Sequence, residues 1–228
     1  LSALQDPSPS NPALLPAANY MVASGEGYVG DYANAFFPAY DKTALEVQTQ
    51  FALWLNRNGR WEDSLALITT EEALQNLGAC ETRAQALAVT RRWDDLLSLA
   101  DAAANAPESF RLTLRALAAK KLGRTGIATK ALTDALEACV QEGRVAEVFR
   151  AADEMGEAEL ADTMLISMCD RPEWAAGLLR VAQDRFGRRG QFDQLAQALE
   201  KVNGAAPHSL VMQDYRRRFE LLANRPVD

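Results

Sequence analysis

The feature that most constrains the fold of this chain is a turn that returns at a nearly constant interval. Related turns lie 32, 32, 33 and 34 residues apart, at Gly59, Arg91, Gly123, Gly156 and Gly190. Between the turns, apolar residues recur every three or four positions, as in an amphipathic helix, and no stretch shows the alternation of a half-buried strand. Because one helical hairpin cannot bury its apolar face, repeated hairpins must stack on their neighbours. The spacing therefore predicts an all-α protein built from repeated helical hairpins.

Other residues keep a fixed place relative to these turns. The residue two positions after each turn opens a predicted helix and is often aromatic: Trp61, Trp93, Thr125, Ala158 and Phe192. The residue five positions after each turn is small or apolar: Ser64, Leu96, Ala128, Ala161 and Leu195. Prolines follow three of the turns, at Pro107, Pro172 and Pro207. We expect the aromatic residue to fill the gap between neighbouring hairpins, and the proline to open or precede the next helix.

The helical pattern begins near residue 44 and continues almost to the end of the chain. We expect helices near 44–58, 61–75, 79–91, 93–105, 108–122, 126–141, 144–154, 157–169, 172–187, 191–202 and 208–223. These helices pair into about five hairpins plus a terminal helix. Residues 44–223 are therefore predicted to form one repeat domain, followed by a short tail at 224–228.

This combination of turn, aromatic residue, small residue and closing proline resembles the tetratricopeptide repeat over residues 45–207. The family's unit has about 34 residues. Arg91 stands where the family has glycine, and a general solenoid of helical hairpins is the alternative. The resemblance implies a right-handed α-α superhelix, a TPR-like solenoid. It also implies that the first helices of successive units line a concave groove for a peptide or helix of another protein.

The chain before the repeats divides into two segments. Residues 1–19 carry four prolines among serines and asparagines, and are predicted to form an extended arm or linker rather than a helix. Residues 20–43 are rich in tyrosine and phenylalanine. Either these aromatics cap the first hairpin, since stacked arrays need their end faces covered, or they fold into a groove or dock on a partner.

Composition and residue types argue against several classes of function. A formal net charge of −7 argues against a general nucleic-acid binder, and no run is long enough to span a membrane. Cys80, Cys139 and Cys169 are far apart and are predicted to be buried, free and not part of a zinc site. The only histidine, His208, is predicted to be a surface or helix-capping residue. We therefore expect no catalytic residue, no metal and no cofactor.

Polar positions beside the apolar stripe of the first helices are the candidates for the partner-binding groove that the resemblance implies. They are Glu46, Thr49, Asn56 and Arg57 in unit one, Glu81 and Gln85 in unit two, Thr113, Lys120 and Lys121 in unit three, and Arg180, Asp184 and Arg188 in unit five. Two arginine-rich runs, at 185–190 and 215–220, are either solvated helix faces or a site for an anionic partner.

Three functional hypotheses follow. The first is a non-catalytic protein–protein interaction scaffold that binds a partner peptide or helix in its groove. The second is that the chain is the helical interaction portion of a larger membrane-tethered or exported protein or enzyme, because it begins with Leu1 rather than Met and its first 19 residues are a Pro-rich arm. The third is a homo-oligomer formed through residues 20–40. A soluble, cytoplasmic protein is the favoured expectation, with export or membrane tethering left open, and the alanine, arginine and leucine content suggests a bacterial source.

Overall fold

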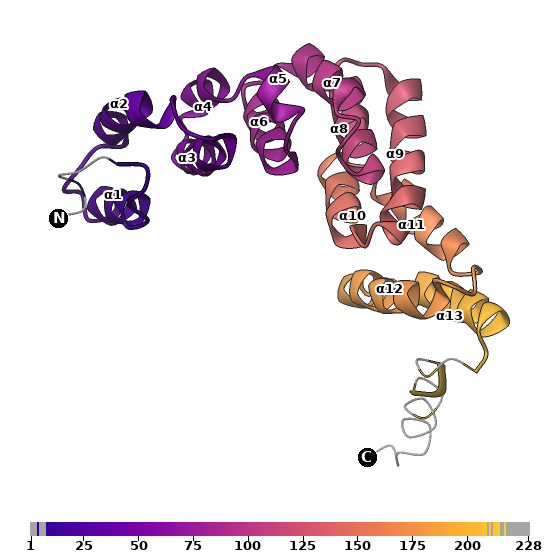
Figure 1. The fold of residues 1–228 in the computed structure, drawn as a ribbon. Coiled ribbons are helices and arrows are strands. Elements are labelled where there is room, and N and C mark those ends of the chain that lie inside the picture. Colours follow the sequence, from indigo (N-terminus) through magenta and orange to yellow (C-terminus); the bar gives the residue numbers. More distant parts are fainter. Residues whose placement is uncertain (1–3, 5–7, 209, 211, 215–216, 218–228) are drawn as a thin grey trace. The chain divides into compact units, whose positions relative to one another are not determined.

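The computed structural model describes residues 4, 8–208, 210, 212–214 and 217 (Figure 1). Over these residues the protein is all-helical, which confirms the all-α part of the prediction. Helices α1 and α2 span Leu14–Ala23 and Val29–Tyr40. The helices that follow are α3 Leu45–Arg57, α4 Trp61–Leu67, α5 Thr70–Ala73, α6 Leu77–Val89, α7 Trp93–Ala102, α8 Glu108–Lys121, α9 Thr125–Gln141, α10 Val145–Glu154, α11 Ala158–Met168, α12 Ala175–Arg189 and α13 Phe192–Ala205. Within the described part of the chain, every helix is too short or too polar to cross a lipid bilayer.

Most predicted helices are present within a few residues of their expected bounds, but the single helix expected at 61–75 is wrong. Helix α4 ends where Ile68 is extended, with φ −107° and ψ 107°. Thr69 then caps α5, because its hydroxyl accepts from the Glu72 amide while the Glu72 side chain accepts from the Thr69 amide. This Thr-x-x-Glu arrangement is a capping box, which starts a new helix rather than continuing the old one.

The expectation that residues up to 19 are extended is also corrected, because α1 begins at Leu14. Pro16 lies in the first turn of α1, where its missing amide proton costs no hydrogen bond. Leu14 and Ala18 are fully buried, and Asn19 accepts a 2.7 Å hydrogen bond from the Trp54 indole of α3. Burial of Leu14 therefore outweighs the Pro-rich composition. The predicted tail at 224–228, and most of the helix predicted at 208–223, lie outside the described residues.

The predicted turn register is confirmed in the backbone. Gly59, Gly123, Gly156 and Gly190 all have φ between 68° and 76°, and Arg91 has φ 60°. After each of these turns, an amide donates to a carbonyl five residues earlier; for example, Arg60 donates to Leu55 at 2.8 Å. This is the hydrogen bond of a Schellman motif, which ends a helix on a left-handed residue. The same arrangement recurs at Gly143, between α9 and α10, which was not among the predicted turns of the repeat.

Replacing Arg91 with glycine is expected to raise the free energy of unfolding by about 0.5–1 kcal/mol. Among the described residues other than glycine, Arg91 alone has a positive φ, which is unfavourable for a residue with a β-carbon. Glycine removes that cost and loses part of the gain through the entropy of the unfolded chain. Urea unfolding followed by circular dichroism measures the effect. Gly123→Ala is the opposite control and is expected to destabilise, because Gly123 has φ 74° although a β-carbon there meets no atom within 4 Å.

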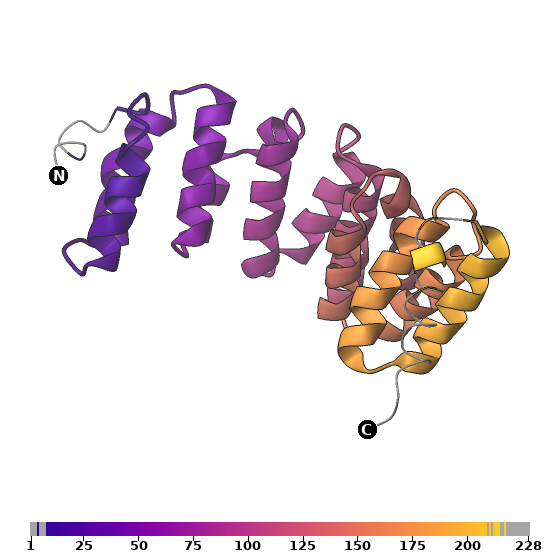
Figure 2. The ribbon, with the colours of Figure 1, turned by 90° about the horizontal axis from the view of Figure 1, so that it is seen from below.

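The structure consists of two compact units, and within each unit a helix packs against its near neighbours in sequence. The first unit comprises Leu1–Pro107 with Leu114–Ala128, and the second comprises Glu108–Thr113 with Thr129–Asp228. In the first unit α3 packs against α4 and α6, and α6 packs against α4, α5 and α7. In the second, α11 packs against α10, α12 and α13, and Figure 2 shows α12 and α13 side by side. Contacts of this kind join successive hairpins.

Aromatic side chains of α2 pack on the first hairpin. Tyr40 stacks on Phe51 of α3 with ring centroids 4.4 Å apart, and Phe51 stacks on Trp54 at 5.7 Å. Phe36 and Phe51 are fully enclosed, whereas Tyr28 is 79% exposed. This packing agrees with the account in which residues 20–43 cap the first hairpin. A docking role for the exposed tyrosines stays a prediction.

The aromatic residues after the turns are less buried than the repeat pattern suggests. Trp61 and Trp93 are half-buried, and Phe192 is 69% exposed. The residues five positions after the turns are better buried, and Leu96 and Ala161 have no exposed surface. The position five residues after each turn therefore predicts burial in the core better than the aromatic position does.

Candidate functional site

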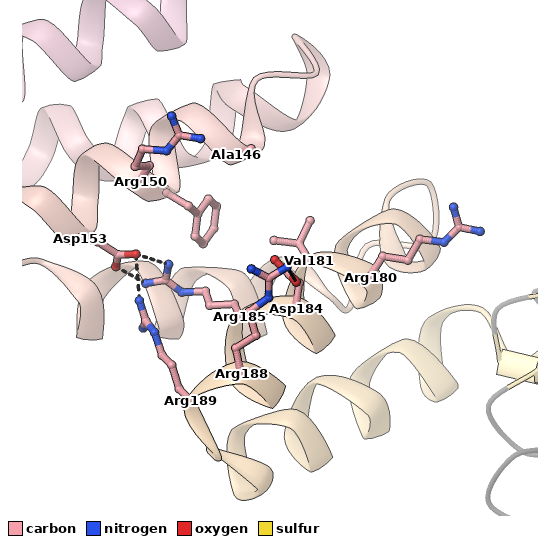
Figure 3. Close-up of a pocket in the computed structure, with 10 residues that line it drawn as sticks. Ala146, Arg150, Asp153, Arg180, Val181, Asp184, Arg185, Arg188 and Arg189 are labelled. Carbon is pink, nitrogen blue, oxygen red and sulfur yellow. Dashed lines mark hydrogen bonds and ion pairs between the residues drawn. The ribbon is translucent and has the colours of Figure 1, made fainter.

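An arginine-lined hollow lies between α10 and α12 in the second unit (Figure 3). Its volume is about 580 Å³. The residues that line it are Ala146, Phe149, Arg150, Asp153, Arg180, Val181, Asp184, Arg185, Arg188 and Arg189. We call this feature the arginine hollow.

Helical spacing places these side chains on facing surfaces. On α10, Ala146, Phe149, Arg150 and Asp153 stand at intervals of three, one and three residues, which is one face of a helix. On α12, the lining residues from Arg180 to Arg189 follow the same rule. The hollow is thus built from the first helices of two successive hairpins, the helices that the sequence predicts to carry the binding surface.

Arg185 is the centre of the arginine hollow and is largely buried, with 7% of its side chain exposed. Its two terminal nitrogens donate to the carboxylate of Asp153 at 2.9 and 2.7 Å, and its Nε donates to Asp162 of α11. The guanidinium also lies over the Phe149 ring, 5.2 Å from the centroid. Because Arg185 joins α10, α11 and α12, its role in the described structure is to hold these helices together.

Asp153 stays ionised in this environment. Burial alone would raise the pKa of Asp153, but hydrogen bonds from Arg185 and Arg189 outweigh it, so its pKa lies below the usual value. Arg189 contributes a 2.8 Å ion pair to the same carboxylate. The carboxylate of Asp153 is therefore occupied by arginines of its own chain.

Two arginines of the hollow have no such partner. Arg188 pairs with Asp184 at 2.5 Å, whereas Arg150 and Arg180 make no ion pair or side-chain hydrogen bond with any residue that the structure describes. Figure 3 shows Arg150 on α10 and Arg180 on α12, separate from the ion-pair cluster of Asp153. Five arginines face three aspartates, Asp162 included, which leaves two positive charges. Arg150 and Arg180 carry these two charges, and we call them the rim arginines.

The structure brings together one of the four predicted groups of groove residues. Arg180, Asp184 and Arg188 of unit five all line the arginine hollow. Among the other groove candidates, exposed side chains belong to Glu46, Arg57, Glu81, Gln85 and Lys121, and half-buried ones to Thr49, Thr113 and Lys120. The hydroxyls of Thr49 and Thr113 donate to carbonyls of their own helices, Leu45 and Ser109, at 2.7 Å. These candidates lie on α3, α6 and α8 and do not line the hollow.

Asn56 is a correction, because it is 1% exposed and cannot meet a partner at the surface. Its Nδ2 donates to the Thr82 carbonyl at 2.9 Å and to Gln85 Oε1 at 3.3 Å. The sequence places Asn56 beside the apolar stripe, but α6 packs over that position of α3. Asn56 therefore connects two helices of the first unit.

The α10 side of the hollow was not among the predicted groove residues. The sequence does carry a signal for this wall. Helix α10 is strongly amphipathic, and one of its faces carries Phe149, Arg150 and Asp153. The arginine run at 185–190 was predicted to be either a solvated helix face or a site for an anionic partner, and its three arginines line the hollow. The second run, at 215–220, lies mostly outside the described residues.

The prediction that the three cysteines are free and buried is confirmed. Cys80, Cys139 and Cys169 are free and buried, and burial raises their pKa values to about 11, 12 and 11. The thiols are therefore protonated at neutral pH and poor nucleophiles. His208 is exposed, as predicted for a surface residue. No group of three metal-ligating side chains gathers anywhere in the described residues.

A second hollow, of about 320 Å³, lies where α8 begins and is lined by several carboxylates. One of them, Glu142, has a structural role. It accepts from the amides of Glu108 and Ser109 at 2.7 and 3.0 Å, and also from the Ser109 hydroxyl. Glu142 thus satisfies amides that the start of a helix leaves without partners.

Replacing Glu142 with glutamine is expected to lower the free energy of unfolding by about 1 kcal/mol at neutral pH. Burial raises the pKa of Glu142, but the hydrogen bonds from Ser109 and Glu108 outweigh it and lower the pKa. A lowered folded-state pKa gives stability above the unfolded pKa, and that stability is lost as the pH falls through the folded pKa. The difference between wild type and variant should therefore shrink below about pH 4. Urea unfolding midpoints of wild type and variant, measured at neutral pH and below about pH 4, test this expectation.

Glu137→Gln is the matched control for that experiment. Glu137 is exposed and lies 3.9 Å from Arg171, so its replacement should change stability little at either pH. A Glu142→Gln effect that is no larger than the Glu137→Gln effect would contradict the capping role.

Comparisons with known proteins add no family to these observations. No protein-family model matches the chain, and neither a curated protein nor a solved structure matches it.

Proposed function

We propose that this protein is a non-catalytic interaction scaffold, a TPR-like solenoid of helical hairpins whose first helices bind a peptide or helix of a partner protein. The observation that carries the proposal is the arginine hollow, because its two walls are the first helices of successive hairpins. A hollow between such helices offers one continuous surface to an extended ligand. The two rim arginines in it make no ion pair with the described residues, so they are available to a partner.

Two further observations support the solenoid. The left-handed turns recur at Gly59, Arg91, Gly123, Gly156 and Gly190, in the register of the tetratricopeptide repeat. Helices in each unit pack against near neighbours in sequence, as expected where a hairpin shares its core with the next one. The buried, protonated thiols and the exposed single histidine favour binding over catalysis.

Selection from a random peptide library on the immobilised protein tests the proposal. A scaffold that binds peptides should enrich related sequences. Synthetic peptides with the enriched sequences should bind in solution with saturable, micromolar affinity, a binding free energy of about −8 kcal/mol. Competition between enriched peptides would show that they share a surface. A selection that enriches nothing beyond a blank matrix, repeated at low salt, would contradict the proposed function.

A further inference from the structure

The arginine hollow has the features of a site for a particular class of segment. From its charge we infer that the segment bound between α10 and α12 is acidic, with carboxylate side chains that pair with Arg150 and Arg180. This inference rests on the proposed function and names the partner chemistry of the same surface.

The first argument is charge. The hollow keeps two uncompensated arginines, whereas the whole chain carries a net charge of −7. The positive surplus is therefore local, and it is maintained on a protein that is otherwise acidic. Arginine suits carboxylates because its planar fork donates two parallel hydrogen bonds to one carboxylate.

The second argument is that the arginines of the hollow differ in how tightly they are paired within the protein. Arg185 and Arg189 are held by Asp153 and Asp162. Arg188 is held more loosely, since 79% of its side chain is exposed in its pair with Asp184. The inner arginines thus fix the walls, while the outer ones are accessible to a ligand. A ligand can bind without breaking the buried pairs.

The third argument is the position of the rim arginines. Arg150 and Arg180 stand on different helices, well apart from each other (Figure 3). A ligand that contacts both must carry negative charges at separate points, as an acidic peptide does. Ala146 and Val181 belong to the same lining and offer apolar contact to an aliphatic side chain. The lining therefore fits a segment that mixes carboxylates with apolar residues.

A nucleic acid fits these observations less well. The hollow occupies two short helices of an acidic chain, and a phosphate backbone that runs beyond it would be repelled by the remaining negative charge. Phe149, the one aromatic residue of the lining, is 4% exposed and offers no face on which a base can stack. An acidic peptide is the occupant that the observations favour.

Fluorescence anisotropy with a short fluorescein-labelled peptide, in which glutamates alternate with leucines, tests this inference. The wild-type protein should bind the peptide with an affinity that falls as salt rises from about 0.05 to about 0.5 M. Arg150→Gln combined with Arg180→Gln should weaken binding about tenfold or more. The same peptide with glutamines in place of glutamates should bind about tenfold more weakly than the acidic one.

Arg124→Gln combined with Lys130→Gln is the matched control, because it removes the same net charge from exposed positions that lie outside the hollow and outside the first helices of the hairpins. Equal weakening by both pairs would show a diffuse charge effect and overturn the inference. Preference for a labelled single-stranded DNA over the acidic peptide would also overturn it. If library peptides bind but the acidic peptide does not, the inference fails while the proposed function stands.

Discussion

Replacing Phe51 with alanine is expected to lower the free energy of unfolding by about 3–5 kcal/mol, among the largest effects of any single change in the first unit. Phe51 has no exposed surface, and it contacts Tyr40, Phe36 and Phe37 of α2 as well as Trp54 of its own helix. Alanine leaves a cavity that these large, rigid rings cannot close. Urea unfolding followed by circular dichroism measures the loss.

The control for Phe51→Ala is Tyr28→Ala. Tyr28 is aromatic and lies at the start of α2, but it is 79% exposed, so its loss should change stability by less than about 0.5 kcal/mol. If the two variants lose similar stability, the aromatic cluster does not hold α2 on the first hairpin. That result would also contradict the capping account of residues 20–43.

Replacing Arg185 with methionine is expected to cost about 3 kcal/mol, because Asp162 loses its closest partner and Asp153 loses one of its two, which leaves both carboxylates with Arg189 alone. The side chain of Asp162 is 12% exposed and that of Asp153 is 33% exposed, so Asp162 has the poorer access to water. Methionine keeps much of the apolar volume and the contact with Phe149. The change therefore tests the charge rather than the packing, and unfolding in urea reports it.

Two further variants identify the cause. Arg188→Met removes an arginine from the same helix, but its pair with Asp184 is exposed and should contribute less than about 1 kcal/mol. Adding Asp153→Asn and Asp162→Asn to Arg185→Met should recover part of the loss, since the two side chains that lost Arg185 then carry no charge. A triple variant that is less stable than Arg185→Met alone would show that the arginine stabilises by packing and not by pairing.

The helices and their turns could be predicted because both depend on local sequence. A left-handed turn needs glycine or tolerates a rare exception such as Arg91, and helical periodicity is visible over a single segment. The break between α4 and α5 also had a local signal, the capping box at Thr69 and Glu72, which was overlooked. The Pro-rich composition of residues 1–19 gave a wrong prediction from Leu14 onward, because burial of Leu14 in the folded chain favours a helix there.

The roles of individual polar residues could not be predicted, because they depend on contacts between distant segments. Asn56 and Arg57 are adjacent in sequence, yet one is buried under α6 and the other is exposed. Arg83 likewise reads as a surface residue but donates to the carbonyls of Leu65 and Ile68 at the end of α4. Within the arginine hollow, the sequence identified the cations of α12 but gave no means to separate the buried Arg185 from the exposed Arg188.

The most direct test of the account is a nuclear magnetic resonance titration of the ¹⁵N-labelled protein with a peptide from the library selection. The amide shifts should concentrate on the facing surfaces of α10 and α12, around Arg150 and Arg180, and Arg150→Gln with Arg180→Gln should raise the peptide concentration needed to produce them about tenfold. Shifts confined to α11 and α13, or no shifts at saturating peptide, would contradict the claim that the first helices of the hairpins carry the binding surface.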